Sequence, residues 1–352
     1  MNQNSDYRHA HVLGWWLLFC AATVFVMVVV GGVTRLTQSG LSMVEWAPIM
    51  GIIPPLNETE WMAVFEKYRL SPEYLKINAG MSLDEFKSIF YWEYGHRVLG
   101  RVIGLIYLLP LLYFLARGMV PRGWYGRLAA LFILGGLQGL LGWYMVKSGL
   151  VDVPHVSQYR LTAHLGLAIV IFATMLWYAM DFLRGERLAT HSSTGFLRLT
   201  AWSAGIVFLM MLSGGFVAGT KAGFIMNTFP TMNGQWIPQG VAAMEPFWHN
   251  LFENPVTVQF IHRCLAVVVV LSVVACFWYS LRQTFVTRAW LLLGVMILQV
   301  TLGITALVMR VPVWAGAAHQ AGAVALLAAA LYVAHRARKR GVDLNSAAVD
   351  RV

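Results

Sequence analysis

Four histidines occur in two pairs of matching segments. His96 in "GHRVLGRVIGL" corresponds to His262 in "IHRCLAVVVVL", and His164 in "LTAHLGLAIVI" corresponds to His319 in "GAAHQAGAVAL". On a helix, the residue four positions on lies on the same face, and here it is always small: Gly100, Ala168, Ala266 and Ala323. Two facing imidazoles with little bulk beside them suit a flat macrocycle, and histidine is a standard axial ligand of haem iron. The pattern predicts two bis-histidine haem sites, one per pair.

Two other interpretations of these histidines stay open. Each could be a packing group that bonds to a neighbouring helix, since small residues are common in membrane helix interfaces. A zinc site would need three or four converging ligands, and the chain contains neither H-x-x-x-H nor C-x-x-C. Because all four histidines occupy matching positions of a repeat, we favour haem ligands over packing groups or a zinc site.

Charged and polar groups beside the histidines differ between the two segments. Glu93 lies three residues before His96 and shares its face on a helix, whereas Gln259 stands at the corresponding place before His262. This difference predicts that the first haem site carries out proton or water chemistry and the second only moves electrons. Arg97 and Arg263 follow the two histidines directly, and they could pair with haem propionates or reach the membrane interface.

The composition requires a membrane around these residues. The chain has 352 residues, of which 58% are hydrophobic and 12% are charged, and its mean hydropathy is +0.63. Apolar stretches of about 20 residues, the length that crosses a bilayer as a helix, recur eight times: 14–33, 98–116, 128–145, 161–180, 199–217, 260–281, 289–308 and 315–334. The sequence predicts an all-α integral membrane protein with eight transmembrane helices.

The charges predict the orientation of these helices. If both termini lie inside, the inner segments carry 14 Lys and Arg and the outer ones nine. The positive-inside rule then places both termini in the cytoplasm, and the absence of a transit peptide favours a bacterial inner membrane. The net charge of +10 therefore reflects topology and contact with the lipid bilayer, not nucleic-acid binding. All four histidines fall near the outer ends of even-numbered spans; His335 follows the last span and is expected to be solvated.

The matching segments also predict the domain organisation. Gln138 and Gly142 repeat the spacing of Gln299 and Gly303 between the two histidine segments of each half. Four spans per half would make a parallel repeat about an axis along the membrane normal. We expect two four-helix bundles, residues 1–183 and residues 184–352.

With these motifs the sequence resembles the haem A synthases of bacteria and mitochondria. The resemblance covers nearly the whole chain and rests on "GGVTRLTQSGLSM", "EYGHR" and "NTFPTMNG" together with the four histidines. Some members carry a cysteine pair in the first outer loop, but residues 34–95 contain none. The chain is therefore similar to the cysteine-free branch.

The resemblance implies oxidation of a porphyrin methyl of haem O to a formyl group, giving haem A for cytochrome oxidase. It implies that His96 and His164 hold the substrate haem, that His262 and His319 hold a resident haem B, and that Glu93 is catalytic. Direct transfer of haem O from a haem O synthase would follow, while the electron-transfer partner stays unknown. Two alternatives stay open: a permanent diheme electron-transfer cytochrome that oxidises quinol, and a repeat transporter with histidines in a proton path.

Overall fold

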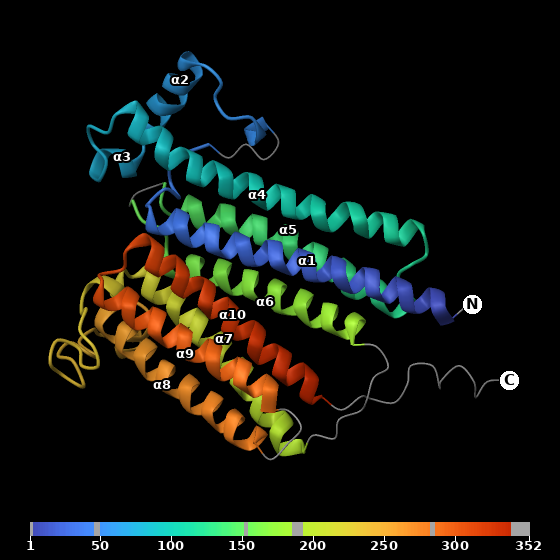
Figure 1. Ribbon diagram of the computed structural model, residues 1–352. Coiled ribbons are helices and arrows are strands. Elements are labelled where there is room, and N and C mark those ends of the chain that lie inside the picture. The colour runs from blue at the N-terminus through green and yellow to red at the C-terminus, as the bar shows by residue number, and fades with distance from the viewer. Residues whose placement is uncertain (1–2, 46–49, 151–153, 185–192, 282–285, 339–352) are drawn as a thin grey trace.

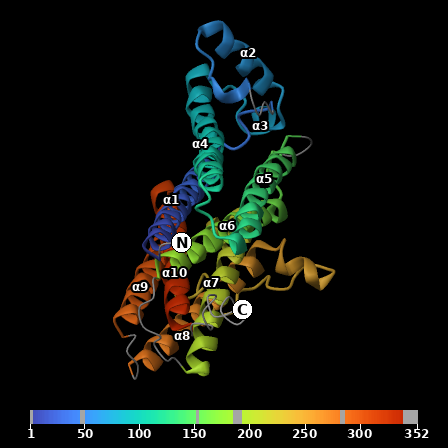
Figure 2. The same ribbon diagram turned by 90° about the vertical axis from the view of Figure 1, so that its right-hand side faces the viewer.

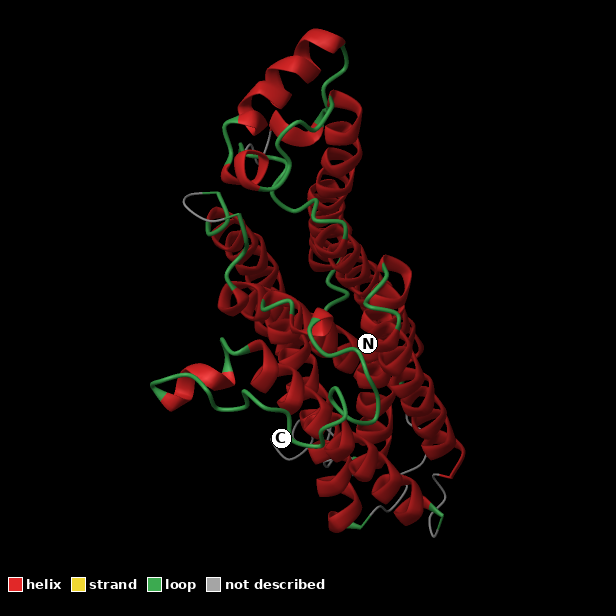
Figure 3. Cartoon of the chain, turned by 90° about the vertical axis from the view of Figure 1, so that its left-hand side faces the viewer, coloured by secondary structure: helices red, strands yellow, loops and turns green. Residues whose placement is uncertain are grey.

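The computed structural model describes residues 3–45, 50–150, 154–184, 193–281 and 286–338. It is almost entirely helical, and these residues form no β-strand (Figure 3). Within these described ranges, eight helices are long and apolar enough to cross a membrane, which confirms the predicted number. They are α1 (Gln3–Leu36), α4 (Leu83–Ala116), α5 (Tyr125–Lys147), α6 (Gln158–Leu183), α7 (Thr194–Gly219), α8 (Pro255–Ser280), α9 (Val286–Val308) and α10 (Val313–Ala337).

These helices run side by side, and α1 begins at the same end of the bundle at which α10 ends (Figure 1). The other end, which we call the loop end, carries two long connections. The first contains the short helices α2 (Glu58–Arg69) and α3 (Pro72–Lys76), and the second joins α7 to α8. Viewed from the end where α1 begins and α10 ends, the two connections project in different directions (Figure 2).

Four helices form the centre of the bundle. Helix α1 contacts α6 and α10, and α7 contacts the same two helices, while α6 and α10 also touch each other. Helices α4 and α5 pack on α1 and α6, whereas α8 and α9 pack on α7 and α10. The division of the chain into two bundles at residue 183 stays a prediction.

Helix α4 is longer than the apolar span predicted from residue 98. Ser82 caps it, with the Ser82 Oγ accepting from the Glu85 N–H at 3.3 Å and the Glu85 carboxylate accepting from the Ser82 N–H at 2.8 Å. Its first turns then pack Phe86 and Phe90 against Trp61, Phe65 and Tyr68. Because aromatic packing extends the helix N-terminal to the apolar stretch, "EYGHR" lies inside α4 and not at its start.

The prediction that His335 is solvated is wrong. Helix α10 continues through this residue, which is 1% exposed, and the His335 Nε2 lies 2.9 Å from the Asp181 carboxylate of α6. Arg184 donates to the His335 carbonyl oxygen at 3.2 Å. This pairing with Asp181 offsets the free-energy cost of burying the imidazole. It also connects α6 to α10 at the end away from the loops.

Candidate functional site

Each of the four histidines lies toward the loop end of its helix. His164, His262 and His319 stand about two turns after the first residues of α6, α8 and α10, which begin at that end (Figure 1). His96 lies further along α4 because α4 begins early, but its ring meets the last turns of α1 at the same end. The predicted histidines therefore gather at one end of the bundle.

Every one of these imidazoles lies against a glycine of a neighbouring helix. A Cβ atom added at Gly31 of α1 would lie 3.0 Å from the Cε1 atom of His96. The corresponding distances to the Cε1 atoms of the other rings are 2.9 Å at Gly142 for His164, 3.5 Å at Gly214 for His262 and 2.7 Å at Gly303 for His319. At Gly31, Gly142 and Gly303 a methyl group would collide with the ring, since ordinary carbon contacts are about 3.5–4.0 Å.

The rings are grouped in the two predicted pairs. His96 and His164 are close enough for their charges to repel if both were protonated, and the same holds for His262 and His319. Among the described residues, no group of three or more His, Cys, Asp or Glu side chains could hold a metal ion. The arrangement fits two axial ligands for each haem and does not support a zinc cage.

Polar groups orient the rings of the second pair. The Ser213 Oγ lies 3.1 Å from the Nδ1 atom of His262, and the Gln299 amide lies 3.1 Å from the Nδ1 atom of His319. Metal-bound histidines commonly donate the N–H of the second ring nitrogen to a fixed acceptor, and the Ser213 hydroxyl can accept from the Nδ1–H of His262 in this way, which leaves the Nε2 atom of that ring to act as a ligand.

The first pair is held differently. The amide nitrogen of Gln138 donates to the carbonyl oxygen of His164 at 3.0 Å and lies 3.4 Å from its Nε2 atom. The Nδ1 atom of His164 is buried without a hydrogen-bond partner. The fit to haem is therefore clearest at the second pair, where both rings are held through Nδ1.

Glu93 is buried in the position that the sequence suggested for an acid beside the first pair. Its side chain is on the same side of α4 as His96, and the residue is 3% exposed. One carboxylate oxygen accepts from the Ser42 hydroxyl at 2.7 Å and from the Met43 N–H at 2.8 Å, while the other accepts from Arg97 at 2.6 Å. Such charge-assisted bonds stabilise a buried carboxylate.

The arginines after the two histidines hold the long connections against the bundle. Arg97 donates to the carbonyl oxygens of Met43 and Glu45 at 3.0 and 3.1 Å. Arg263 donates to the carbonyl oxygens of Met226 and Thr228 at 2.9 and 3.0 Å. Both guanidinium groups thus bind the connections, and their contact with haem propionates stays a prediction.

Gln259 takes the place of Glu93 in the second set of contacts. Its amide nitrogen donates to the Met226 carbonyl oxygen at 3.1 Å, so the neutral residue bonds to the connection as the acid does, with the direction of donation reversed. The two connections are therefore held at the same place, but Glu93 accepts hydrogen bonds from its connection whereas Gln259 donates one to its own.

The sequence reasoning missed the glycines that contact the rings and the partners of Glu93. It noted Gly142 and Gly303 only as repeat positions and took as ring neighbours only small residues on the same helix as each histidine, although Gly31 and Gly214 both occur in Gly-Gly pairs at matching places before the long connections. The repeat would have shown this signal. Two further histidines lie apart from the pairs: His155 is exposed, and His249 bonds to Glu253 at 3.2 Å.

Comparison with known proteins shows the family to which the chain belongs. Residues 14–331 match the family described as cytochrome oxidase assembly protein. The chain is 52% identical to the "Heme A synthase" of Nitrosospira multiformis over 347 residues, which covers 96% of this chain and 97% of the relative. It is 45% identical to a human heme A synthase over 340 residues, which covers 93% of this chain and 83% of the human protein. The chain belongs to the family of cytochrome oxidase assembly proteins that includes these heme A synthases.

Proposed function

We propose that this protein is a haem A synthase, an oxidoreductase that converts a porphyrin methyl group of haem O to a formyl group. Haem A made in this way serves cytochrome oxidase, in keeping with the family. The structural observation that carries the proposal is the buried carboxylate of Glu93 beside one histidine pair, with the amide of Gln259 in the corresponding place beside the other. Of these two corresponding residues, Glu93 is the one that can accept a proton.

The two pairs have different tasks in this proposal. His96 and His164 hold haem O as substrate, and His262 and His319 hold a resident haem B. Support comes from the second pair, whose rings are both fixed through Nδ1. A permanently bound group profits from such fixed ligands. When bound, haem B supplies a redox centre that accepts electrons from the first site.

Glu93 accepts the protons that leave when the methyl carbon is oxidised. The Ser42 hydroxyl, the Met43 N–H and Arg97 fix its carboxylate, so it does not have to reorganise when the proton arrives. A positioned general base typically contributes about 10²-fold to 10⁴-fold to a rate. The bonds from Arg97 to the connection also hold that segment over this end of the helices.

We further propose that the loop end faces the periplasm of a bacterial inner membrane and that both termini are cytoplasmic. The excess of Lys and Arg in the segments at the other end supports this orientation. A membrane-bound haem O synthase would supply the substrate, because haem O is too apolar to diffuse freely through water.

The proposal is tested by identifying the haems extracted from membranes of an oxidase-free host that makes haem O. Haem A should appear with this protein, should disappear with His96→Ala and should persist with His155→Ala, which removes an exposed histidine of the same end. If the protein instead binds two haem B per chain and leaves haem O unchanged, it is a diheme electron-transfer cytochrome.

A further inference from the structure

A second buried carboxylate lies in the connection that covers the first histidine pair. Glu73 of α3 is 4% exposed, although it belongs to a polar segment at the loop end. The Tyr68 hydroxyl donates to it at 3.2 Å, and the Asn78 amide donates to the Tyr68 oxygen at 2.7 Å. An acid is rarely buried in this way without a partner of opposite charge in contact, and the mechanism above does not use Glu73.

Glu73 belongs to the same electrostatic environment as Glu93. Burial raises the pKa of the Glu73 carboxyl to about 7; the Tyr68 hydrogen bond opposes this rise, the charge of Glu93 adds to it and Arg35 opposes it. These groups come from α2, α4 and α1, respectively. Glu73 is therefore an acid near Glu93 that changes protonation around neutral pH.

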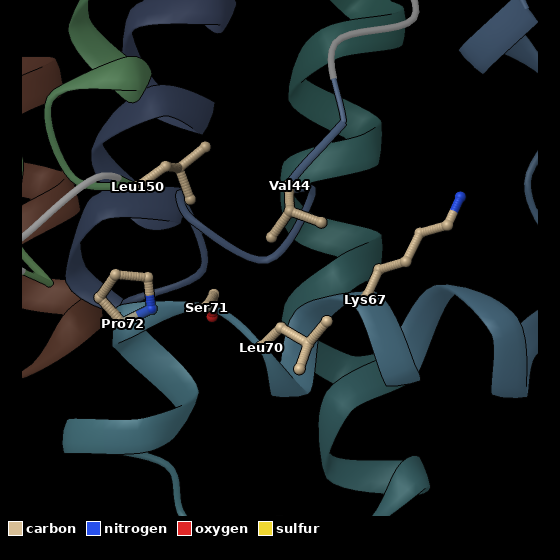
Figure 4. Close-up of a pocket in the computed structure, with 6 residues that line it drawn as sticks. All are labelled: Val44, Lys67, Leu70, Ser71, Pro72 and Leu150. Atoms are coloured by element: carbon tan, nitrogen blue, oxygen red, sulfur yellow. The ribbon is translucent and has the colours of Figure 1, made fainter.

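A hollow of about 190 Å³ is lined by residues that neighbour Glu73 and the segment bonded to Glu93, although neither acid lines it. Its lining residues are Val44, Lys67, Leu70, Ser71, Pro72 and Leu150 (Figure 4). Val44 follows Met43, which donates to Glu93, and Pro72 precedes Glu73. The hollow therefore lies where the backbone segment that binds Glu93 meets the start of α3, and it is large enough for several water molecules.

We propose that Glu73 takes protons from Glu93 and releases them to water at the loop end, which regenerates Glu93 between oxidation steps. The proposal rests on the proposed function, because it needs protons to be produced at the first site. In the transfer, the O–H bond of protonated Glu93 breaks and an O–H bond forms on ionised Glu73, with water molecules relaying the proton between the two carboxylates. Glu73 then gives the same proton to water or buffer in the hollow, and no electrons move. Glu73 does not touch the substrate, so it acts through Glu93.

The test compares Glu73→Gln with Glu66→Gln, which removes an exposed acid of α2. The haem O to haem A rate is measured over a pH range that spans the titration of Glu73, with the haem content of each protein as a second readout. In the unchanged protein the rate should rise with pH, because Glu73 must be ionised to accept a proton. Glu73→Gln should keep its haem but lose about tenfold or more in rate at neutral pH, less than loss of a direct general base would cost, and its rate should no longer follow this titration.

Added sodium acetate should restore rate to Glu73→Gln and leave the unchanged protein and Glu66→Gln unaffected, because a diffusible carboxylate replaces a proton acceptor and not a packing group. If Glu73→Gln does not fold, Tyr68→Phe keeps the carboxyl and removes its donor, and the pH profile should then move to higher pH. Equal rates and pH profiles for Glu73→Gln and the unchanged protein would overturn the proposal, as would an unmoved profile in Tyr68→Phe. Absence of haem A from the unchanged protein would instead overturn the proposed function.

Discussion

Replacement of Gly303 by alanine should displace the imidazole of His319 and weaken haem binding at the second pair. The new Cβ would lie 2.7 Å from the Cε1 atom of that ring. To restore an ordinary carbon contact, the ring or helix α9 must retreat by about 0.8 Å. His319 is also held through its Nδ1 atom by Gln299 of the same α9 helix, so movement of the ring strains this bond as well.

Overpacking of this kind typically costs about 1–3 kcal/mol, which corresponds to roughly 5-fold to 150-fold weaker binding of a group that needs the undisturbed ring. Two matched variants separate this effect from a general loss of folding. A Cβ at Gly294 of the same helix meets no atom within 4 Å, and a Cβ at Gly214 lies 3.5 Å from the Cε1 atom of His262, an ordinary contact. Gly294→Ala and Gly214→Ala should therefore retain haem.

The assay is the amount of haem B per purified chain, determined from the absorbance of its reduced pyridine complex, together with the thermal stability of each variant. The expected order of haem loss is Gly303→Ala far above Gly214→Ala, with Gly294→Ala unchanged. If Gly214→Ala loses as much haem as Gly303→Ala at equal stability, close packing of glycine against the ring is not what the site requires.

Three further variants test other contacts. Glu93→Gln should keep its haem but lose roughly 10²-fold to 10⁴-fold in haem A formation, measured by extraction and chromatography; an active variant would rule out proton transfer by Glu93. Glu73→Gln should be more stable than the unchanged protein above pH 7, by up to about 3 kcal/mol. The raised pKa of Glu73 means that its stabilising contribution is complete below its ordinary pKa near 4.5 and is lost as pH rises through about 7, so thermal unfolding of the two proteins should converge at low pH. Ser82→Ala removes the cap of α4 and should cost about 1 kcal/mol, seen as faster hydrogen exchange in the first turn of α4 with the turns around His96 unchanged.

The number of membrane helices and the four histidines could be predicted from the sequence because both are local signals. An apolar run of about 20 residues reports a span without knowledge of its neighbours. Histidines that recur in matching segments of a repeat likewise indicate a shared role without knowledge of the contacts between helices. The difference between Glu93 and Gln259 was visible for this reason, since it required only the alignment of one segment with another.

The remaining features depend on contacts between distant segments. The start of α4 at Leu83 is fixed by aromatic packing against α2, and a window that measures apolar character does not detect it. The burial of His335 depends on Asp181 of another helix. The partners of Glu93 come from residues some fifty positions earlier in the chain, a separation at which spacing along a helix carries no information.

The two arginine contacts hold the connections beside both proposed haem sites in the same way. Arg97 and Arg263 each follow a histidine and each bind carbonyl oxygens of the long connection of their own half, so the connections are held in the same way whether or not the site performs chemistry. What differs is the residue one turn before each arginine, which accepts hydrogen bonds as Glu93 and donates one as Gln259. Because the arginines keep their bonds, exchange of these two residues should leave both connections in place and move the proton acceptor, at the loss of the bond from residue 259 to the Met226 carbonyl oxygen. A protein with Glu93→Gln and Gln259→Glu that bound haem normally but made no haem A would show that the acid must stand beside the substrate pair.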